Sequence, residues 1–340
     1  MSDRFRIDGE KLSLHPERVA QWRAADTWEK AQHLFPIYVE ASPVGACSHR
    51  CRHCAVDYIG YKNVQLESTR MFDVLRDMGD AGVKAIMYAG EGEPLLHKKI
   101  NEMVLATHFN GMDSAFTTNG VLLDKLKLDH VSWVKVSVNA GTRETYANVH
   151  RTDPKDWDRV WANIADAVQR KGNCAIGVQM VALPENEGEQ GALRNMAYQA
   201  GVDYVVIKPY SQHKMSITRE YEGYKPVEIH RAPGVIVRDA AIATTEHPYD
   251  RCLATPNFWS YLMASGDLYS CSAYLLDDRF NLGNVNTHSF REIWQGEKRR
   301  QNWEYVRNEL DISECRVNCR MARANEYLAG FDNVEHRNFI

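Results

Sequence analysis

The sequence has neither an excess of basic residues nor a long hydrophobic run. Its 41 lysine and arginine residues are outnumbered by 45 aspartate and glutamate residues, which gives a formal net charge of −4. Proteins that grip a nucleic-acid backbone carry clustered positive charge, so we expect no nucleic-acid partner. No stretch approaches the roughly 18 consecutive apolar residues of a membrane span, and residues 1–18 lack the apolar segment of a signal peptide. We therefore expect a cytoplasmic protein that does not associate with membranes.

Internal repeats, low-complexity segments and obvious linkers are also missing from the chain. Of its 340 residues, 44% are apolar and 25% are charged, which is typical of globular proteins and unlike disordered or fibrous chains. The length exceeds that of a usual single domain. We therefore expect one large domain with a smaller one attached to it.

Cysteine is scarce, with eight residues in all, yet Cys47, Cys51 and Cys54 lie close together. In a reducing compartment such clusters are more often metal ligands or catalytic groups than disulfides. The C-x3-C-x2-C spacing lets three thiolates bind three irons of a [4Fe-4S] cluster, which leaves the fourth iron open. A zinc site or scattered buried thiols are the alternatives, although zinc ligands usually come in pairs, and the flanking His49 and Arg50 do not suit an apolar core.

Hydrophobic periodicity alternates between strand and helix along residues 37–210. Short apolar runs predict strands at 37–41, 84–90, 113–120, 133–139, 174–181 and 203–210. Amphipathic stretches predict helices at 67–81, 98–110, 155–172 and 189–201, and a short helical passage at 122–128. Such βα units form a parallel sheet with right-handed crossovers, and six of them curl into a partial (βα)6 barrel of the α/β class. Ligands bind such folds at the carboxyl ends of the strands.

With its cysteine triad on the loop after the first strand, the segment 36–215 resembles the radical S-adenosylmethionine (radical SAM) superfamily. The resemblance implies that Cys47, Cys51 and Cys54 bind a [4Fe-4S] cluster whose open iron binds S-adenosylmethionine (SAM). The family reduces this cluster to cleave SAM, so the resemblance also implies an electron donor such as flavodoxin or ferredoxin.

The stretch 90-GEGEPL-95, after the second strand, resembles the glycine-rich segment of the family that meets the amino group of SAM. In this interpretation Gly92 permits close approach of the backbone. Glu93 supplies a negative charge near the ammonium group, and Pro94 belongs to the same contact segment. A turn beside a strand often has a similar composition, so the position of the stretch in the fold is what supports the interpretation.

Polar residues at the ends of the third and fourth strands are further candidates for cofactor contact. Ser137 and Asn139 resemble the polar pair that contacts the ribose or carboxylate of SAM in this family. Thr118 and Asn119 lie at the equivalent end of the third strand. Alternatively, the first pair only caps a strand end, and the second pair only forms the turn before Gly120.

The last quarter of the chain contains four further cysteines: Cys252, Cys271, Cys315 and Cys319. The first two follow the pattern C-x13-G-x4-C around a predicted hairpin at 258–271, and a helix is expected after Ser289. These features resemble the SPASM and twitch extensions of radical SAM enzymes. A full SPASM set has seven cysteines for two clusters, so four imply one fully ligated auxiliary [4Fe-4S] cluster, with structural zinc as the alternative.

These features predict four parts of the chain. Residues 1–35 are expected to form a helical extension that covers the barrel, and residues 36–215 the barrel itself. A connector at 216–250 then leads to a small hairpin and helix domain at 251–340, which carries the auxiliary cluster.

The chemistry that the resemblance implies is hydrogen abstraction by a 5′-deoxyadenosyl radical. Because a four-cysteine cluster has no open iron, we expect it to accept an electron and not to bind substrate. The leading hypothesis is oxidation of a carbinol in a small molecule such as a sugar, aminocyclitol or nucleotide derivative.

Candidate catalytic residues lie where the sixth strand ends, at Lys208, Tyr210 and His213, with Gln212 beside them. His213 is the first choice for proton transfer because the ordinary pKa of histidine lies near neutrality. Glu40 on the first strand and His53 beside the triad are further candidates. Each of these residues is also compatible with an ordinary surface polar role.

Three alternatives remain. A ribosomal peptide maturase, which crosslinks or epimerises its substrate, commonly carries a leader-binding domain of about 80 residues. Only the segment 1–35 precedes the first strand, which favours a small substrate. A radical epimerase needs a hydrogen donor, but Cys174 opens a strand and should lie at the far rim of the barrel from SAM, as a small buried hydrophobe. A cluster-bearing electron carrier would leave the GEGEP motif unexplained.

Overall fold

The computed structural model describes residues 5–7, 9–225, 227–238, 249–316, 319–332 and 334–336. Its strands are β1 (Tyr38–Ala41), β2 (Ala85–Tyr88), β3 (Asp113–Thr118), β4 (Val131–Ser137), β5 (Ala175–Ala182), β6 (Tyr204–Pro209), β7 (Val235–Val237), β8 (Trp259–Leu262), β9 (Asp267–Tyr269) and β10 (Asn281–Asn284). Its helices are α1 (Pro16–Ala24), α2 (Trp28–Ala31), α3 (Ser68–Asp80), α4 (Ile100–Phe109), α5 (Arg143–His150), α6 (Lys155–Arg170), α7 (Gln190–Gln199), α8 (Phe290–Trp294), α9 (Glu297–Asn308) and α10 (Ala322–Ala329).

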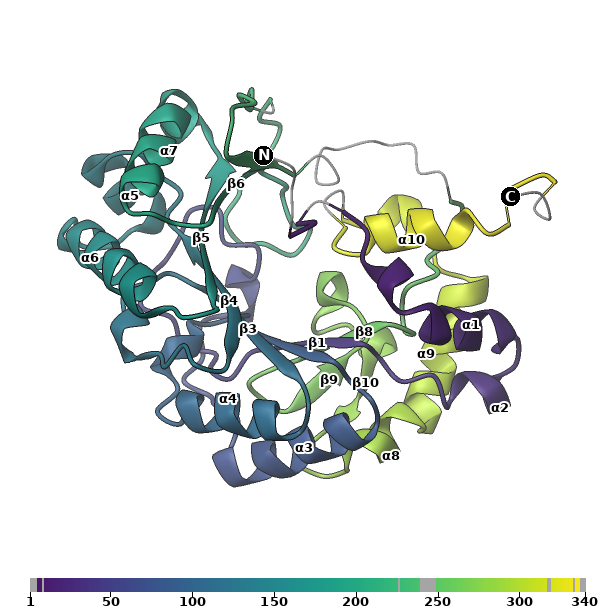
Figure 1. Cartoon of the computed structure of the whole chain (residues 1–340). Helices are drawn as coiled ribbons and strands as arrows, with labels where there is room; N and C mark the ends of the chain where they lie inside the picture. The colour runs from purple at the N-terminus through teal and green to yellow at the C-terminus, as the bar shows by residue number, and fades with distance from the viewer. Residues whose placement is uncertain are drawn as a thin grey trace.

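These strands form one sheet of ten, in the order β10-β9-β8-β1-β2-β3-β4-β5-β6-β7. Strands β1 to β6 run parallel to their neighbours within that series. Figure 1 shows α3 to α7 along the outer face of the curved sheet, with α8 beside α3, and with α9 and α10 near the N-terminal helices α1 and α2. The predicted α/β fold, a partial (βα)6 barrel followed by a hairpin and helices, is therefore confirmed.

The strands separate an apolar outer face from a polar inner face. Side chains alternate between the two faces of a strand, and on β1 Val39 packs into the main core with the helices while its neighbour Glu40 lies on the opposite face. Lys135 on β4 and Lys208 on β6 likewise alternate with core valines and isoleucines. The barrel therefore presents charged side chains on its concave side.

The predicted helices and strands of the barrel agree with the structure to within a few residues at most ends. Helix α5 was not predicted; it starts where Thr142 Oγ1 accepts a hydrogen bond from the Thr145 amide at 3.3 Å and stops at Arg151, whose φ is +49°. The helical passage expected at 122–128 is only a 3₁₀ turn at Leu123–Lys125. None of the helices in the described residues combines the length and apolar character that crossing a bilayer requires.

The sheet continues beyond the six predicted strands on both sides. Within the expected connector 216–250, of which residues 226 and 239–248 lie outside the described residues, β7 pairs in parallel with β6, so this part of the segment extends the barrel sheet. On the other side, β8 pairs in parallel with β1, and β9 pairs antiparallel with β8. The predicted hairpin is confirmed, and it is built onto the barrel sheet.

The C-terminal helix predicted after Ser289 is α8. Ser289 Oγ accepts a hydrogen bond from the Glu292 amide at 3.2 Å, and Glu292 Oε2 accepts one from the Ser289 amide at 2.7 Å. This reciprocal pair is a capping box, which satisfies amides at the helix start that have no partner within the helix. The local sequence therefore determines where α8 begins.

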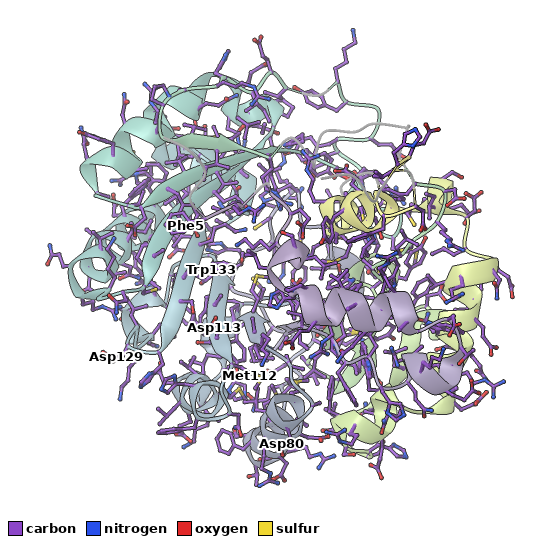
Figure 2. All side chains as sticks on the ribbon, turned by 45° about the vertical axis from the view of Figure 1, so that its right-hand side comes forward. Phe5, Asp80, Met112, Asp113, Asp129 and Trp133 are labelled. Atoms are coloured by element: carbon purple, nitrogen blue, oxygen red, sulfur yellow. The ribbon has the colours of Figure 1, made fainter. Side chains whose placement is uncertain are left out.

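The N-terminal segment forms helices that contact the C-terminal part of the chain as well as the barrel, and its role as a cover of the barrel stays a prediction. Leu12 and Val19 pack with Phe258 and Leu328 of the C-terminal part. At the far end of the sheet the Phe5 ring lies 5.3 Å from the ring of Tyr204, and Figure 2 shows Phe5 on the same side of the molecule as Trp133. The segment therefore joins the two parts of the chain along the edge opposite the cysteine loop.

Candidate active site

The cysteine triad lies on the loop after β1, as predicted, and this loop is held against the end of α5. The Arg50 amide donates to the His150 carbonyl at 3.1 Å, and the Arg52 amide donates to the Val149 carbonyl at 2.9 Å. A further bond of 3.1 Å, from the Cys54 amide to the Cys51 carbonyl, closes a turn within the loop. The loop is therefore shaped by the backbone of a helix that the sequence did not predict.

The three thiols disfavour one another's ionisation. Burial raises the pKa of the Cys47 thiol to about 11. Burial also raises the pKa of the Cys51 thiol well above its ordinary value, and the nearby Cys54 and Cys47 sulfurs raise it further. A bound metal stabilises thiolates and reverses this effect. The donor set therefore suits a metal centre, and an all-sulfur set suits iron or zinc.

Three imidazoles lie near Cys51, of which His49 and His150 are buried. His150 Nδ1 lies 3.1 Å from Cys51 Sγ, while His150 Nε2 lies 2.9 Å from the Val138 carbonyl oxygen. The rings of His49 and His53 lie 5.1 and 5.9 Å from that of His150. Burial lowers the pKa of His53 to about 3 and that of His150 well below its ordinary value, so both rings are neutral near pH 7.

His49, Cys51 and His150 also form a possible metal-binding group, because their donor atoms lie within 4.8 Å of one another. Sequence reasoning missed His150, which is separated from Cys51 by 99 positions. No local spacing signals this contact. His53, proposed as a catalytic helper, lies beside the ring of His150, and its catalytic role stays a prediction.

The GEGEP stretch packs against the backbone segment that leads into the cysteine triad. A Cβ atom on Gly92 would lie 2.2 Å from the Val44 carbonyl oxygen and 2.3 Å from that of Ala46. The Glu93 amide donates to the Ala46 carbonyl at 2.9 Å. Gly92 therefore lies against the backbone that leads into the triad, and its close approach to SAM stays a prediction.

The Glu93 carboxylate is buried and fully engaged with the protein. It accepts hydrogen bonds from Thr118 Oγ1 at 2.6 Å, the Asn119 amide at 2.8 Å and the Leu95 amide at 3.1 Å. Burial raises the pKa of this carboxyl, and the bonds from Asn119 and Thr118 oppose that rise. Glu93 therefore joins the ends of β2 and β3; its contact with the SAM ammonium stays a prediction. Pro94 is buried in the 3₁₀ turn that follows.

The polar residues at the strand ends do gather around the cysteine loop. Asn119 Nδ2 donates to Ser48 Oγ at 3.0 Å. Asn139 has a φ of +56°, and its Oδ1 accepts from the Val181 amide at 2.8 Å while its Nδ2 lies 3.3 Å from His53 Nε2. Ser137 is half-buried at the end of β4. Asn119 and Asn139 thus contact residues of the cysteine loop, and the contacts of all these residues with SAM stay predictions.

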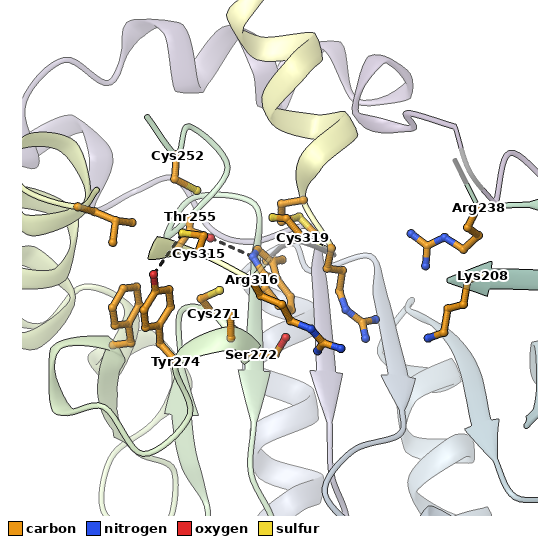
Figure 3. Close-up of a pocket in the computed structure, with 16 residues that line it drawn as sticks. Lys208, Arg238, Cys252, Thr255, Cys271, Ser272, Tyr274, Cys315, Arg316 and Cys319 are labelled. Atoms are coloured by element: carbon orange, nitrogen blue, oxygen red, sulfur yellow. Dashed lines mark hydrogen bonds between the residues drawn. The ribbon is translucent and has the colours of Figure 1, made fainter. Parts of the chain in front are cut away.

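The four C-terminal cysteines line one pocket, shown in Figure 3. Tyr274 Oη lies 3.2 Å from Cys315 Sγ, and the Tyr274 ring stacks on Phe280 at 4.0 Å. Asn325 Oδ1 accepts from the Leu253 amide at 2.8 Å and so holds the loop beside Cys252. Burial raises the pKa of the Cys271 thiol well above its ordinary value. The convergence of four sulfurs fits one closed metal centre, as the sequence predicted.

The residues after β6 lie near this pocket. His213 was proposed for proton transfer because the ordinary pKa of histidine lies near neutrality, and the structure does not support that reason. Its ring stacks on Tyr58 at 5.1 Å, and its Nδ1 accepts from the Met215 amide at 3.1 Å. Burial, with the Arg316 charge next, lowers the pKa of His213 to about 4. The expectation of a pKa near neutrality is therefore wrong, because the ring is desolvated. Tyr210 donates its hydroxyl to Gln212 Oε1 at 2.6 Å.

Lys208 lies in a group of charged residues that the sequence did not reveal. Glu40, the other proposed helper, forms an ion pair with Arg320, in which Glu40 Oε2 lies 2.9 Å from Arg320 Nη1. Lys208 and Arg320 also line the pocket of the four cysteines, together with Arg238 and Arg316. Arg316 and Arg320 directly follow Cys315 and Cys319. This repeated Cys-Arg pair is the sequence feature that could have indicated positive charge beside the four cysteines.

Comparison with known proteins identifies two regions of the chain. The family model described as the Radical SAM superfamily matches residues 42–196. The SPASM model, described as an iron-sulfur cluster-binding domain, matches residues 252–320. Each range contains one of the two cysteine sets.

Curated relatives match part of the chain. GTP 3′,8-cyclase of Chlorobaculum tepidum is 28% identical over 200 residues, which are 55% of this chain and 58% of that protein. Fe-coproporphyrin III synthase of Methanosarcina barkeri is 29% identical over 135 residues, which are 35% of this chain and 33% of that protein. The chain thus spans less than two thirds of either relative.

Solved structures show the same fold. SuiB of Streptococcus suis bound to S-adenosylmethionine matches with a TM-score of 0.59 and 16% identity, over 84% of this chain and 70% of SuiB. Native anSMEcpe with bound AdoMet matches with a TM-score of 0.56 and 13% identity, over 87% of this chain and 96% of that one. At these identities the likeness concerns the fold alone.

Proposed function

The chain belongs to the radical SAM superfamily and carries a SPASM-type iron-sulfur domain, and from this we propose that it oxidises a carbinol in a small-molecule substrate. The two domains imply a [4Fe-4S] cluster with SAM and an auxiliary iron-sulfur cluster. When bound, these groups supply the 5′-deoxyadenosyl radical and accept the electron that the oxidation releases. We assign the first cluster to Cys47, Cys51 and Cys54.

One observation carries the proposal: the pocket of the four cysteines is also lined by Lys208 of β6. Lys208 lies near the carboxyl end of a barrel strand, the region where ligands of such folds bind. A substrate that contacts Lys208 is therefore close to both the barrel cavity and the auxiliary site. That arrangement favours a reaction in which hydrogen abstraction and electron removal act on the same molecule.

Lys208 is our candidate for accepting the hydroxyl proton. Burial lowers its pKa well below the ordinary value, and the charges of Lys135, Arg238 and Arg316 lower it further. A lysine with a lowered pKa holds its proton less tightly than an ordinary lysine and is better suited to act as a base. His213 is neutral and buried, so we assign it to holding Tyr58 and the loop after β6, with Tyr210 beside it.

The substrate class we favour is a nucleotide derivative, with sugars and aminocyclitols as the wider group. Relatives named GTP 3′,8-cyclase act, by their name, on a nucleotide. Peptide maturation is the alternative, since SuiB has been crystallised with its precursor peptide. Epimerisation with Cys174 as hydrogen donor is disfavoured, because this residue is buried and precedes β5, at the end of the barrel opposite the cysteine loop.

Turnover also requires one electron from outside for each cleavage of SAM. We propose a flavodoxin or ferredoxin as the donor, since both carry single electrons at low potential. Dithionite replaces this donor in the experiments below.

The test follows deuterium from the substrate into 5′-deoxyadenosine. The anaerobically reconstituted protein is incubated with dithionite, SAM and pools of deuterated nucleotide sugars, and both products are measured by mass spectrometry. We expect substrate-dependent deuterium transfer and a product three mass units lighter than the deuterated substrate, because oxidation removes the carbinol deuterium and the hydroxyl proton. Transfer from a peptide pool but from none of the small molecules would contradict the proposed substrate class.

Removing the auxiliary site tests its role in oxidation. We expect Cys315→Ala with Cys319→Ala to retain about four of about eight irons, to stop product formation and to continue cleaving some SAM without product. Cys174→Ala is the matched control and should retain all irons and wild-type product formation. A folded double variant that lacks four irons but forms product at the wild-type rate would reject the role of electron acceptor.

A further inference from the structure

Tyr274 connects two ligands of the four-cysteine site. It ends the 3₁₀ turn Ser272–Tyr274 that directly follows Cys271, and its backbone amide donates to the Cys271 carbonyl at 3.3 Å. Its hydroxyl oxygen lies 3.2 Å from Cys315 Sγ, and Figure 3 shows this hydroxyl pointing toward Cys315. The residue is therefore anchored beside one ligand, and its side chain reaches another that is 41 positions away along the chain.

Aromatic packing fixes the position of the Tyr274 ring. The ring stacks on Phe280, with 4.0 Å between the ring centres and an angle of 4° between the planes. Phe280 is fully buried, and the Tyr305 ring meets it nearly at right angles, at 5.9 Å. Stacking depends on the ring and not on the hydroxyl. The packing therefore places the Tyr274 hydroxyl at the Cys315 sulfur without help from the hydrogen bond itself.

Metal binding decides which partner of this hydrogen bond is the donor. While Cys315 is a thiol, either the hydroxyl or the thiol can donate. A cysteine that binds a metal is a thiolate, which has no proton and can only accept. Tyr274 must then donate, and hydrogen bonds to charged acceptors are stronger than those between neutral groups. The bond therefore gains strength when Cys315 becomes a metal ligand.

Hydrogen bonds to the ligand sulfurs are among the factors that set the reduction potential of an iron-sulfur cluster. Reduction adds one negative charge, and a donor at a sulfur stabilises the reduced state more than the oxidised state. In the proposed oxidation the substrate radical loses one electron to the four-cysteine site and one proton to the base, which leaves the carbonyl product. A one-electron carrier then removes the electron. A donor at Cys315 therefore favours the transfer from the substrate.

We propose that Tyr274 is a positioning residue that donates a hydrogen bond to the Cys315 sulfur and raises the reduction potential of the auxiliary cluster. This inference rests on the proposed function, because it assigns the role of electron acceptor to the four-cysteine site. Tyr274 acts through Cys315 and not through contact with the substrate. Its hydroxyl and not its ring is the group that matters.

The experiment is a redox titration of the reconstituted holoprotein, followed by electron paramagnetic resonance under anaerobic conditions. The auxiliary signal is the one that the double variant Cys315→Ala with Cys319→Ala lacks. Tyr274→Phe keeps the ring and its stacking but removes the hydroxyl. We expect this variant to lower the equilibrium constant for reduction of the auxiliary cluster by about tenfold, which is about 59 mV for one electron. Iron content and thermal unfolding establish that the variant is folded and loaded.

Tyr305→Phe is the matched control. The Tyr305 ring packs on the same Phe280, but its hydroxyl accepts a hydrogen bond from Arg279 Nη1 at 2.7 Å. This variant should keep the wild-type potential. A loaded Tyr274→Phe protein with the wild-type potential, or an equal shift in both variants, overturns the inference.

A measurement on the wild type does not depend on any variant. After exchange into D2O, electron-nuclear double resonance of the reduced auxiliary cluster should detect a coupled deuteron, and Tyr274→Phe should weaken this signal. A wild type in which no exchangeable deuteron couples to the cluster overturns the inference.

Deuterium transfer from the substrate is measured in parallel to separate the two proposals. The expected shift in potential without deuterium transfer leaves the role of Tyr274 standing and rejects the proposed oxidation. Deuterium transfer and product formation with an unchanged potential in Tyr274→Phe reject the role of Tyr274 alone. Zinc at the four cysteines, with no redox signal, overturns both this inference and the role of electron acceptor.

Discussion

At the residue scale, Gly92 shows why the motif 90-GEGEPL-95 is built as it is. The backbone of Gly92 passes so close to the carbonyl oxygens of Val44 and Ala46 that a Cβ atom would overlap both, at 2.2 and 2.3 Å. Real Cβ atoms stay farther than this from backbone oxygens, so the cysteine loop would have to move. The glycine is therefore needed to hold the triad in place, in addition to any contact with SAM.

We expect Gly92→Ala to reduce the iron bound at the triad and to abolish most cleavage of SAM. The reason is displacement of the loop that carries Cys47, since two backbone atoms cannot yield as a flexible side chain would. Iron content and 5′-deoxyadenosine formation measure both effects. Gly191→Ala is the control, because a Cβ there has no neighbour within 4 Å and alanine favours the helix. Equal iron content in the two variants would disprove the steric explanation.

At the scale of elements, Glu91 connects the loop after β2 to the hairpin of the C-terminal part. Its Oε1 accepts a hydrogen bond of 2.6 Å from the Ala264 amide, in the turn between β8 and β9. Glu91 is buried, and burial raises its pKa. Together with the pairing of β8 on β1, this bond fixes the orientation of the hairpin that leads to Cys271.

Glu91→Ala should lower the free energy of unfolding by about 1–3 kcal/mol, because the buried Ala264 amide loses its acceptor. We also expect less iron at the four-cysteine site. Glu91→Gln retains an acceptor oxygen and should lie closer to wild type in both measurements, which are chemical denaturation and iron content per site. If the alanine and glutamine variants were equally stable, the bond to Ala264 would not be what holds the hairpin.

At the scale of the whole molecule, Arg299 of α9 joins three segments that are distant in the sequence. It is fully buried and donates to the carbonyls of Leu34 and Pro256 at 3.2 Å and of Ala31 at 3.3 Å. Its guanidinium also lies 4.2 Å from the centre of the Trp294 ring. The N-terminal helices, the approach to β8 and helix α9 are therefore held by one side chain.

Arg299→Lys should lower the free energy of unfolding by about 3 kcal/mol, since an ammonium cannot reach several carbonyls in one plane and remains buried. Denaturant titration of the reconstituted protein measures this change. Arg300→Lys, on the next residue, alters an exposed side chain that pairs with Glu304 at 3.1 Å and should change stability by less than about 0.5 kcal/mol. Similar losses in both variants would show that Arg299 does not join the segments.

The sequence by itself determined the features that depend on neighbours along the chain. The spacing of Cys47, Cys51 and Cys54 places three thiols on one loop, and side-chain periodicity separates the parallel strands and most helices. Ser289 and Glu292 likewise mark the start of α8 through contacts three residues apart. Such features are set by local backbone geometry, so they could be predicted without knowledge of the fold.

Only the tertiary structure decided what distant residues do together. His150 reaches Cys51 across 99 positions, and Glu91 reaches the Ala264 amide because the C-terminal hairpin pairs with β1. The lowered pKa of His213 follows from burial that its sequence neighbours do not reveal. Convergence and desolvation depend on strand order and packing, which no local pattern encodes.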